Sequence, residues 1–181
     1  WPAGLFGYFP TYSLGALAAA QSRRGDPLWH AIGVAYLGAA ILAFLWLRQD
    51  PLTGRAMVLW LIAVVWATDI GAYLAGRAIG GPRLAPDISP GKTWAGLAGG
   101  VLAAVLAGVG AAAVLDSSSY ALMALISAGL AVVAQVGDLF ESQLKRRAGV
   151  KDSSALIPGH GGVLDRIDGL LAAALVLGGF A

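Results

Sequence analysis

The stretch WAGLAGGVLAAVLAGVGAAAVL, residues 94–115, is a continuous run of apolar and small residues without one charged side chain. A helix rises 1.5 Å per residue, so about 20 such residues cross the hydrocarbon core of a bilayer. Similar runs occupy residues 29–47, 56–75 and 120–137. Hydrophobic residues make up 58% of the 181 positions and charged residues only 12%. The sequence therefore predicts an all-α fold, a polytopic transmembrane helix bundle.

A fifth apolar stretch, residues 169–181, is short for a membrane span. We expect it to span only if it is joined to residues 163–168 or to residues beyond the chain. Within the run at 94–115, Gly96 and Gly100 share one helical face, and Gly108 lies further along it. Small residues on one face predict close helix packing in lipid, although they are also common as filler in alanine-rich helices.

The basic residues are distributed unevenly between the two sides of the predicted bundle. Ten of the twelve lie in the loops at 21–28, 76–93 and 141–166, and only Arg48 and Arg55 lie on the other side. Because basic loops stay in the cytoplasm, we expect a multi-pass protein of the inner membrane with both long polar loops facing the cytoplasm. A net charge of +2 gives no reason to expect nucleic acid. The lack of cysteine excludes disulfides and thiolate chemistry.

The longest polar segment, residues 137–169, has the composition of a phosphate-transfer site. Asp138, Asp165 and Asp168 are hard oxygen ligands, and Mg²⁺ usually binds one or two carboxylates together with substrate phosphates. A helix beginning near Asp165 would place Asp165 and Asp168 on one face. The basic residues that would balance a triphosphate are Lys145, Arg146, Lys151 and Arg166. Together these residues predict metal-assisted phosphoryl or nucleotidyl transfer at the membrane surface.

Each part of this segment also has a simpler explanation. The run at 145–147 is typical of an anchor beside anionic lipid headgroups. His160 is equally typical of a loop histidine that bonds its neighbours, and the carboxylates can form ordinary surface pairs. The occurrence of all these groups in one segment favours a site.

Residues 142–168 resemble, without a gap, the signature of the phosphatidate cytidylyltransferases, also called CDP-diglyceride synthetases. The matching positions are Ser142, Leu144, Lys145, Arg146, Lys151, Asp152, Ser154, the run 158–162 (PGHGG) and the run 165–168 (DRID). Two shorter blocks, 69–77 (DIGAYLAGR) and 89–94 (SPGKTW), are also similar to that family. Ile70 and Ala95 depart from its pattern, which puts details of metal or lipid contact in doubt.

The resemblance implies transfer of a cytidylyl group from CTP to phosphatidate, giving CDP-diacylglycerol and pyrophosphate. It implies Mg²⁺ as cofactor, with a second cation left open, and contact with membrane lipids; a homodimer is also left open. We interpret Asp138, Asp165, Asp168 and Lys151 as catalytic, the first two as metal ligands. The residues we interpret as substrate-binding are Asp69, Ser89, Lys92, Thr93, Lys145, Arg146, His160, Gly161, Gly162 and Arg166.

Asp69 stands near the end of an apolar run, where a charged side chain is costly and usually faces the protein interior. We expect it to line the catalytic cavity. The alternative is a structural pair with Arg77, two helical turns along the chain.

Residues 1–22 are expected to differ from the membrane-embedded domain at 23–181. They resemble a fragment of thermostable-type zinc carboxypeptidases, yet the chain lacks the His-Glu-x-x-His helix of such enzymes, so a fused segment is our interpretation. Because the sequence begins at Trp1 rather than Met, we expect it to be part of a longer chain. Two other functions remain open, a CTP-dependent polyprenol or dolichol kinase and, from a different class, a membrane transporter.

Overall fold

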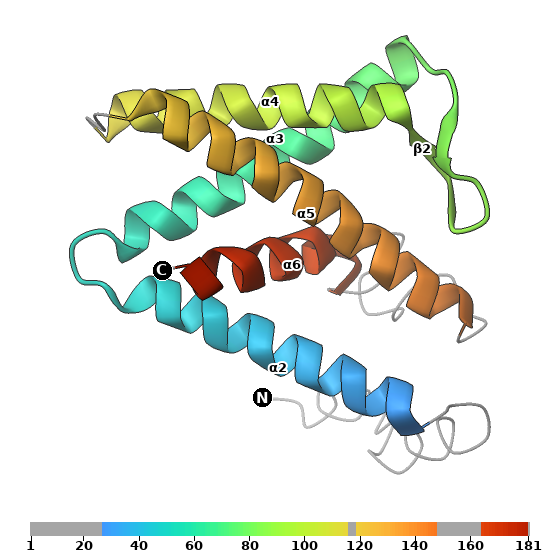
Figure 1. Cartoon of the computed structure of the whole chain (residues 1–181), viewed down its shortest axis with the longest axis horizontal. Helices are drawn as coiled ribbons and strands as arrows, with labels where there is room; N and C mark the ends of the chain where they lie inside the picture. Colours follow the sequence, from blue (N-terminus) through green and yellow to red (C-terminus); the bar gives the residue numbers. More distant parts are fainter. Residues whose placement is uncertain (1–26, 116–118, 148–163, 181) are drawn as a thin grey trace, which may run out of the picture. The chain divides into compact units, whose positions relative to one another are not determined.

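The computed structural model describes residues 27–115, 119–147 and 164–180. The helices are α2 (Pro27–Gln49), α3 (Gly54–Ala78), α4 (Trp94–Val114), α5 (Tyr120–Arg147) and α6 (Leu164–Phe180). The strands are β1 (Arg83–Ala85) and β2 (Ser89–Thr93) (Figure 1). The chain divides into two compact units, Trp1–Val34 and Ala35–Ala181, and the packing described below lies within the second.

The predicted transmembrane bundle is confirmed. Four helices, α2 to α5, are long and apolar enough to cross a membrane. The fifth apolar stretch does join the residues before it, because α6 begins at Leu164 and includes Asp165 and Asp168. One boundary was wrong: the polar loop expected to begin at Glu141 is helical as far as Arg147. The helix continues because residues 138–147 contain good helix formers and no glycine or proline.

The segment between α3 and α4 was expected to be a plain loop and is instead a two-stranded antiparallel hairpin. β1 pairs with β2 through Arg83 and Thr93 at one end and Ala85 and Ser89 at the other. Gly80 and Gly81 adopt positive φ values of 67° and 95°, which turn the chain from α3 into the hairpin. The hairpin leads directly into α4, so its position is fixed by the start of that helix.

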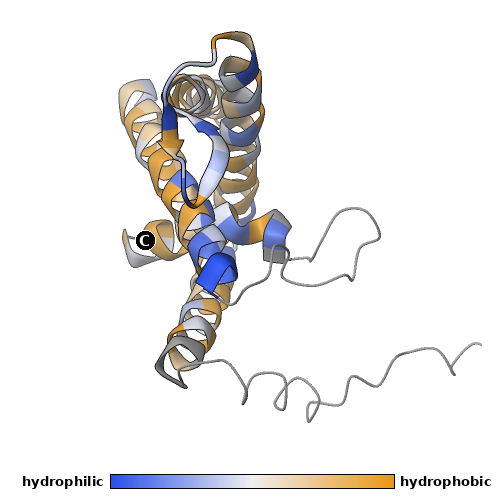
Figure 2. Cartoon of the chain, turned by 90° about the vertical axis from the view of Figure 1, so that its right-hand side faces the viewer, coloured by the Kyte–Doolittle hydropathy of each residue, from blue (hydrophilic) through white to orange (hydrophobic). Residues whose placement is uncertain are grey.

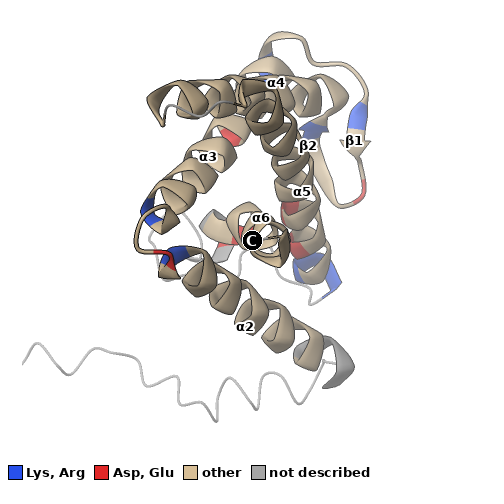
Figure 3. Ribbon diagram, turned by 60° about the vertical axis from the view of Figure 1, so that its left-hand side comes forward, with Lys and Arg blue, Asp and Glu red and all other residues tan. Residues whose placement is uncertain are grey.

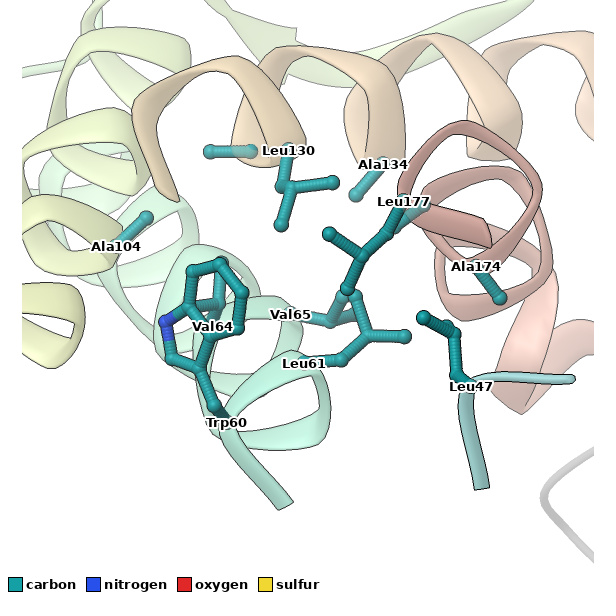
Figure 4. Packing of buried hydrophobic residues seen from close by; sticks show 12 residues of the cluster. Leu47, Trp60, Leu61, Val64, Val65, Ala104, Leu130, Ala134, Ala174 and Leu177 are labelled. Carbon is teal, nitrogen blue, oxygen red and sulfur yellow. The ribbon is translucent and has the colours of Figure 1, made fainter. Parts of the chain in front are cut away.

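The buried core consists of aliphatic, alanine and tryptophan side chains that α2 to α6 all contribute (Figure 4). Leu61 and Val64 of α3 are fully buried, and they meet Leu130 of α5 and Leu177 of α6 in the same cluster. Many other large apolar side chains are exposed, among them Trp66 at 64% and Leu106 at 64%. Such exposure suits helices whose outer faces lie against lipid.

Helices α3 and α4 approach until backbone touches backbone. A Cβ placed on Gly71 of α3 would lie 2.6 Å from the carbonyl oxygen of Gly99 in α4. A Cβ on Gly100 would lie 2.9 Å from the carbonyl oxygen of Thr68. Gly96 and Gly100 are both buried, so the close packing expected from their spacing is confirmed.

Further along α4, Gly108 faces α5 rather than α3. A Cβ there would collide with the hydroxyl of Ser127 and lie 2.8 Å from the carbonyl oxygen of Met123. The same Ser127 hydroxyl accepts a hydrogen bond of 3.2 Å from the indole Nε1 of Trp60 in α3. Three helices therefore meet at one small, buried polar contact.

At the opposite end of the bundle from the hairpin, Asp50 closes the turn between α2 and α3. Its Oδ1 accepts hydrogen bonds of 2.8 Å from the backbone amides of Leu52 and Thr53. These amides stabilise the carboxylate and hold the pKa of Asp50 below its ordinary value.

Substitution of Gly108 tests the packing of α4. Gly108→Ala should lower the thermal unfolding midpoint in detergent, because overpacking a tight contact costs about 1–3 kcal/mol. Gly110→Ala is the matched control, since Gly110 lies two residues away in the same helix with nothing within 4 Å of its added Cβ. The control should keep or raise the midpoint, because alanine favours helix over glycine by about 0.5–1 kcal/mol. Equal midpoints for the two variants would contradict the packing described here.

Candidate active site

A cavity of about 180 Å³ opens at the end of the bundle where the hairpin lies. Its walls come from α3, β2, α4 and α5. The lining residues are Asp69, Ala72, Tyr73, Gly91, Lys92, Thr93, Gly96, Leu97, Gln135 and Asp138. Polar side chains from α3, β2 and α5 thus converge on one space, although both helices are apolar along most of their length.

Lys92 reaches across this cavity from β2 to α5. Its Nζ lies 2.7 Å from Oδ2 of Asp138 and donates to Oε1 of Gln135 at 2.9 Å. The neighbouring residue, Thr93, caps α4 by accepting a hydrogen bond of 3.0 Å from the amide of Gly96. Because the cap fixes where strand becomes helix, it also fixes the direction in which Lys92 projects.

A second ion-paired group lies one to two turns further along α5. Lys145 Nζ lies 2.7 Å from Oδ1 of Asp165 at the start of α6 and 3.5 Å from Oε1 of Glu141. Gln135, Asp138 and Lys145 fall at helical spacings of three and seven residues, so one face of α5 serves both groups. The contact between Lys145 and Asp165 also ties the end of α5 to the beginning of α6.

The two groups are electrostatically continuous. Asp138 lies within range to act on both Asp69 and Asp168, and Asp168 in turn acts on Glu141. We call these residues the carboxylate–lysine cluster. Its members are Asp69, Lys92, Asp138, Glu141, Lys145, Asp165 and Asp168.

The carboxylate–lysine cluster holds more carboxyl groups than basic groups, five against two. Glu141 is 7% exposed, and its oxygens have no hydrogen-bond partner among the described residues, so its contact with Lys145 is the ion pair of 3.5 Å. A buried carboxylate without such partners is costly unless another cation or donor is supplied. The cluster is therefore suited to binding a cation.

Charged and polar residues gather at this end of the bundle and are scarce elsewhere. Figure 2 shows the hydrophilic residues around the hairpin and the ends of the neighbouring helices. Figure 3 shows charged residues at the hairpin and along the last turns of α5, whereas α4 contains none. The contact between Lys92 and Asp138 places the loop after α3 and the end of α5 on the same side, as the sequence predicted.

The structure brings together most of the predicted site residues that it describes. Asp69, Lys92, Thr93 and Asp138 line the cavity, and Lys145, Asp165 and Asp168 continue from it. Asp165 and Asp168 do lie in one helix, as expected from their spacing.

Two predicted residues lie apart from the carboxylate–lysine cluster. Ser89 pairs with Ala85 in the hairpin and does not line the cavity, and Arg146 is exposed. Arg166 lies in the first turn of α6 and stays a prediction. Four others lie outside the described residues: Lys151, His160, Gly161 and Gly162.

The alternative role of Asp69, an ion pair with Arg77, is wrong. Arg77 Nη1 donates instead to the hydroxyl of Tyr73 at 2.9 Å, and no ion pair joins it to Asp69 in this part of the chain. Asp69 lines the cavity, as expected.

Two residues that contact the lysines of the site were not among the predicted site residues. Gln135 binds Lys92 through its side chain, and Glu141 sits beside Lys145. Gln135 was detectable as a polar residue inside an apolar run three residues before Asp138. Glu141 was harder to detect, because it was assigned to a loop, where a glutamate is ordinary.

Comparison with known proteins assigns the chain to a family. The sequence model described as the cytidylyltransferase family matches residues 8–180. The chain belongs to this family.

Curated relatives from several bacteria are all named phosphatidate cytidylyltransferase. A phosphatidate cytidylyltransferase of Brucella suis is 49% identical over 157 residues, covering 87% of this chain and 57% of the relative. One from Pseudomonas aeruginosa is 48% identical over 152 residues (80% and 55%), and one from Bacillus subtilis is 42% identical over 137 residues (75% and 51%). The chain thus spans about half the length of these relatives. The match at residues 8–180 includes part of the segment interpreted as fused, and the boundary at residue 22 stays a prediction.

Proposed function

We propose that this chain carries the catalytic helices of a phosphatidate cytidylyltransferase, which transfers a cytidylyl group from CTP to phosphatidate. The observation that carries the proposal is the carboxylate–lysine cluster at one end of a membrane-spanning bundle. A lipid phosphate lies at the membrane surface and a nucleotide is dissolved in the adjoining water. A site at the end of a membrane-spanning bundle is therefore accessible to both. Membership of the cytidylyltransferase family and the name shared by the relatives support this substrate pair.

The proposed reaction is a direct transfer between the two substrates and needs no covalent bond to the protein. A phosphatidate oxygen forms a bond to the α-phosphorus of CTP, and the bond from that phosphorus to the β-phosphate oxygen breaks, so that pyrophosphate leaves with the electron pair. Lys92 and Lys145, which contact Asp138 and Asp165, would bind phosphate oxygens and balance their charge. Positioning and electrostatic stabilisation would supply most of the rate enhancement.

The donor set fits Mg²⁺, which needs only one or two carboxylates when substrate phosphates supply further oxygens. Within the described ranges, no three carboxylate or histidine side chains lie together as a metal-binding group. Asp138 and Asp165 would hold the ion, with Asp168 and Asp69 in support. When bound, Mg²⁺ neutralises phosphate charge and aligns the attacking and leaving oxygens.

We further propose that this end of the bundle faces the cytoplasm of the bacterial cell. Ten of the twelve basic residues lie on the segments assigned to that side. Because the chain contains no cysteine, single cysteines can be labelled cleanly. In inverted membrane vesicles, Asp87→Cys in the hairpin should react with a membrane-impermeant maleimide and Leu52→Cys should not. The opposite pattern would reverse the orientation.

The reaction itself is tested with labelled nucleotide. Label from the α-phosphate of CTP should enter the lipid product, and label from the γ-phosphate should appear in pyrophosphate. Entry of the γ-label into lipid would instead identify a lipid kinase. If the full-length protein is folded in detergent or vesicles and neither label enters lipid, the proposed activity is wrong.

The metal-ligand assignment is tested by removing one charge at a time. Asp138→Asn and Asp165→Asn should each lower turnover by about a hundredfold or more at saturating Mg²⁺, because asparagine keeps the shape but holds a hard cation poorly. Asp87→Asn is the control, since Asp87 is an exposed aspartate in the turn of the hairpin. Thermal unfolding in detergent should show that all three variants are folded. A folded variant that keeps more than about a tenth of normal turnover, a loss below about 1.4 kcal/mol, would rule out its carboxylate as a ligand.

A further inference from the structure

Each of the two carboxylates assigned to the metal already has a lysine ammonium against it. Lys92 Nζ lies 2.7 Å from Oδ2 of Asp138, and Lys145 Nζ lies 2.7 Å from Oδ1 of Asp165. An ammonium group at this distance occupies part of the oxygen's accepting capacity and repels a second cation placed beside it. Asp138 should therefore bind a metal ion less tightly while Lys92 stays in this position.

The contact at Lys92 is well supported by its surroundings. The lysine side chain is 17% exposed and that of Asp138 is 32% exposed, so water screens the pair only in part. Gln135 supplies two further acceptors, its side-chain Oε1 at 2.9 Å and its backbone oxygen at 3.4 Å. Lys92 projects from a short hairpin and lines the cavity, and its long side chain has several rotatable bonds.

We propose that Lys92 is an internal counter-ion of Asp138, which it releases when a divalent cation and a phosphate group arrive together. In the empty site, Lys92 neutralises Asp138. In the loaded site, Lys92 binds a phosphate oxygen, and Asp138 is left to coordinate the cation. The inference rests on the proposed function, because the cation and the phosphate are those of that reaction.

The charges of the cavity explain why the two ligands should arrive together. A divalent cation alone must displace or approach the ammonium of Lys92, and like charges at this distance repel. A phosphate group alone meets the carboxylates of Asp69 and Asp138, which repel it in turn. When both are present, every charge finds an opposite partner. Binding of each ligand should therefore strengthen binding of the other by the same factor.

Direct measurement of Mn²⁺ binding, with Mn²⁺ standing in for Mg²⁺, tests the exchange without reference to turnover. The full-length protein in detergent is separated from free ions by ultrafiltration, and retained Mn²⁺ is measured. Without other ligands, Lys92→Met should bind Mn²⁺ about tenfold more tightly than the unmodified protein. Arg83→Met is the matched control, because it removes one positive charge from an exposed position of the same hairpin. It should bind Mn²⁺ as the unmodified protein does.

Two further measurements, one with CTP and one with phosphatidate, identify which substrate supplies the phosphate that Lys92 binds. Addition of CTP or of a short-chain phosphatidate should raise the Mn²⁺ affinity of the unmodified protein about tenfold and that of Lys92→Met much less. Enhancement by CTP alone would assign Lys92 to the nucleotide, and enhancement by phosphatidate alone would assign it to the lipid. Enhancement by neither would overturn the exchange.

The remaining outcomes separate the exchange from the function on which it rests. If the unmodified protein and Lys92→Met bind Mn²⁺ equally without ligands, Lys92 is not a competing counter-ion and the exchange is wrong, while the metal site stands. If no protein retains Mn²⁺ under any condition, the metal site itself fails. Should Lys92→Met not fold, Gln135→Met removes the 2.9 Å support of Lys92 without stripping Asp138 of its partner. It should shift Mn²⁺ affinity in the same direction by about threefold, and no shift would overturn the exchange.

Discussion

Backbone contact between α3 and α4 is the constraint on which the site depends. Where Gly71 meets Gly99, no side chain separates the two helices, so α3 and α4 can shift little relative to each other. Asp69 of α3 and the start of α4 are thereby brought to opposite walls of one cavity. The hairpin between these helices must close over a short, fixed gap, and Lys92 projects from it toward α5. In lipid, where apolar surfaces attract one another only weakly, such packing of small residues is what makes one arrangement preferred.

The four long helices α2 to α5 and their order along the chain were predictable from the sequence, because a span must be apolar for about 20 residues and satisfy its own backbone hydrogen bonds in lipid. Helix ends were less predictable. Residues 138–147 are polar yet helical, since the requirement for apolar side chains ends at the membrane surface while helix propensity does not. The hairpin was missed because three- and five-residue strands leave almost no alternating pattern.

For the site, sequence motifs identified residue types but not partners. Asp138 and Asp165 were expected to act together, which stays a prediction, and the structure adds a lysine beside each of them within the carboxylate–lysine cluster. Such pairing depends on which faces of α5, α6 and β2 meet, and spacing within one element carries no information about that. Gln135 and Glu141 can be recognised as site residues only from their contacts with Lys92 and Lys145, which the structure shows.

The contact among Trp60, Ser127 and Gly108 has a consequence for how this protein can change over time. The serine hydroxyl fills the space that a methyl group on residue 108 would need, and it also accepts the indole hydrogen bond. A larger residue at 108 needs a smaller residue at 127 together with a small shift of α5, because the carbonyl oxygen of Met123 also lies 2.8 Å from the added Cβ. A residue at 127 without the hydroxyl leaves the buried indole of Trp60 without its acceptor. Substitutions at the three positions are thus interdependent, and the order in which they arise decides which of them survive. Across related sequences, these positions on three different helices should vary as a set rather than one at a time.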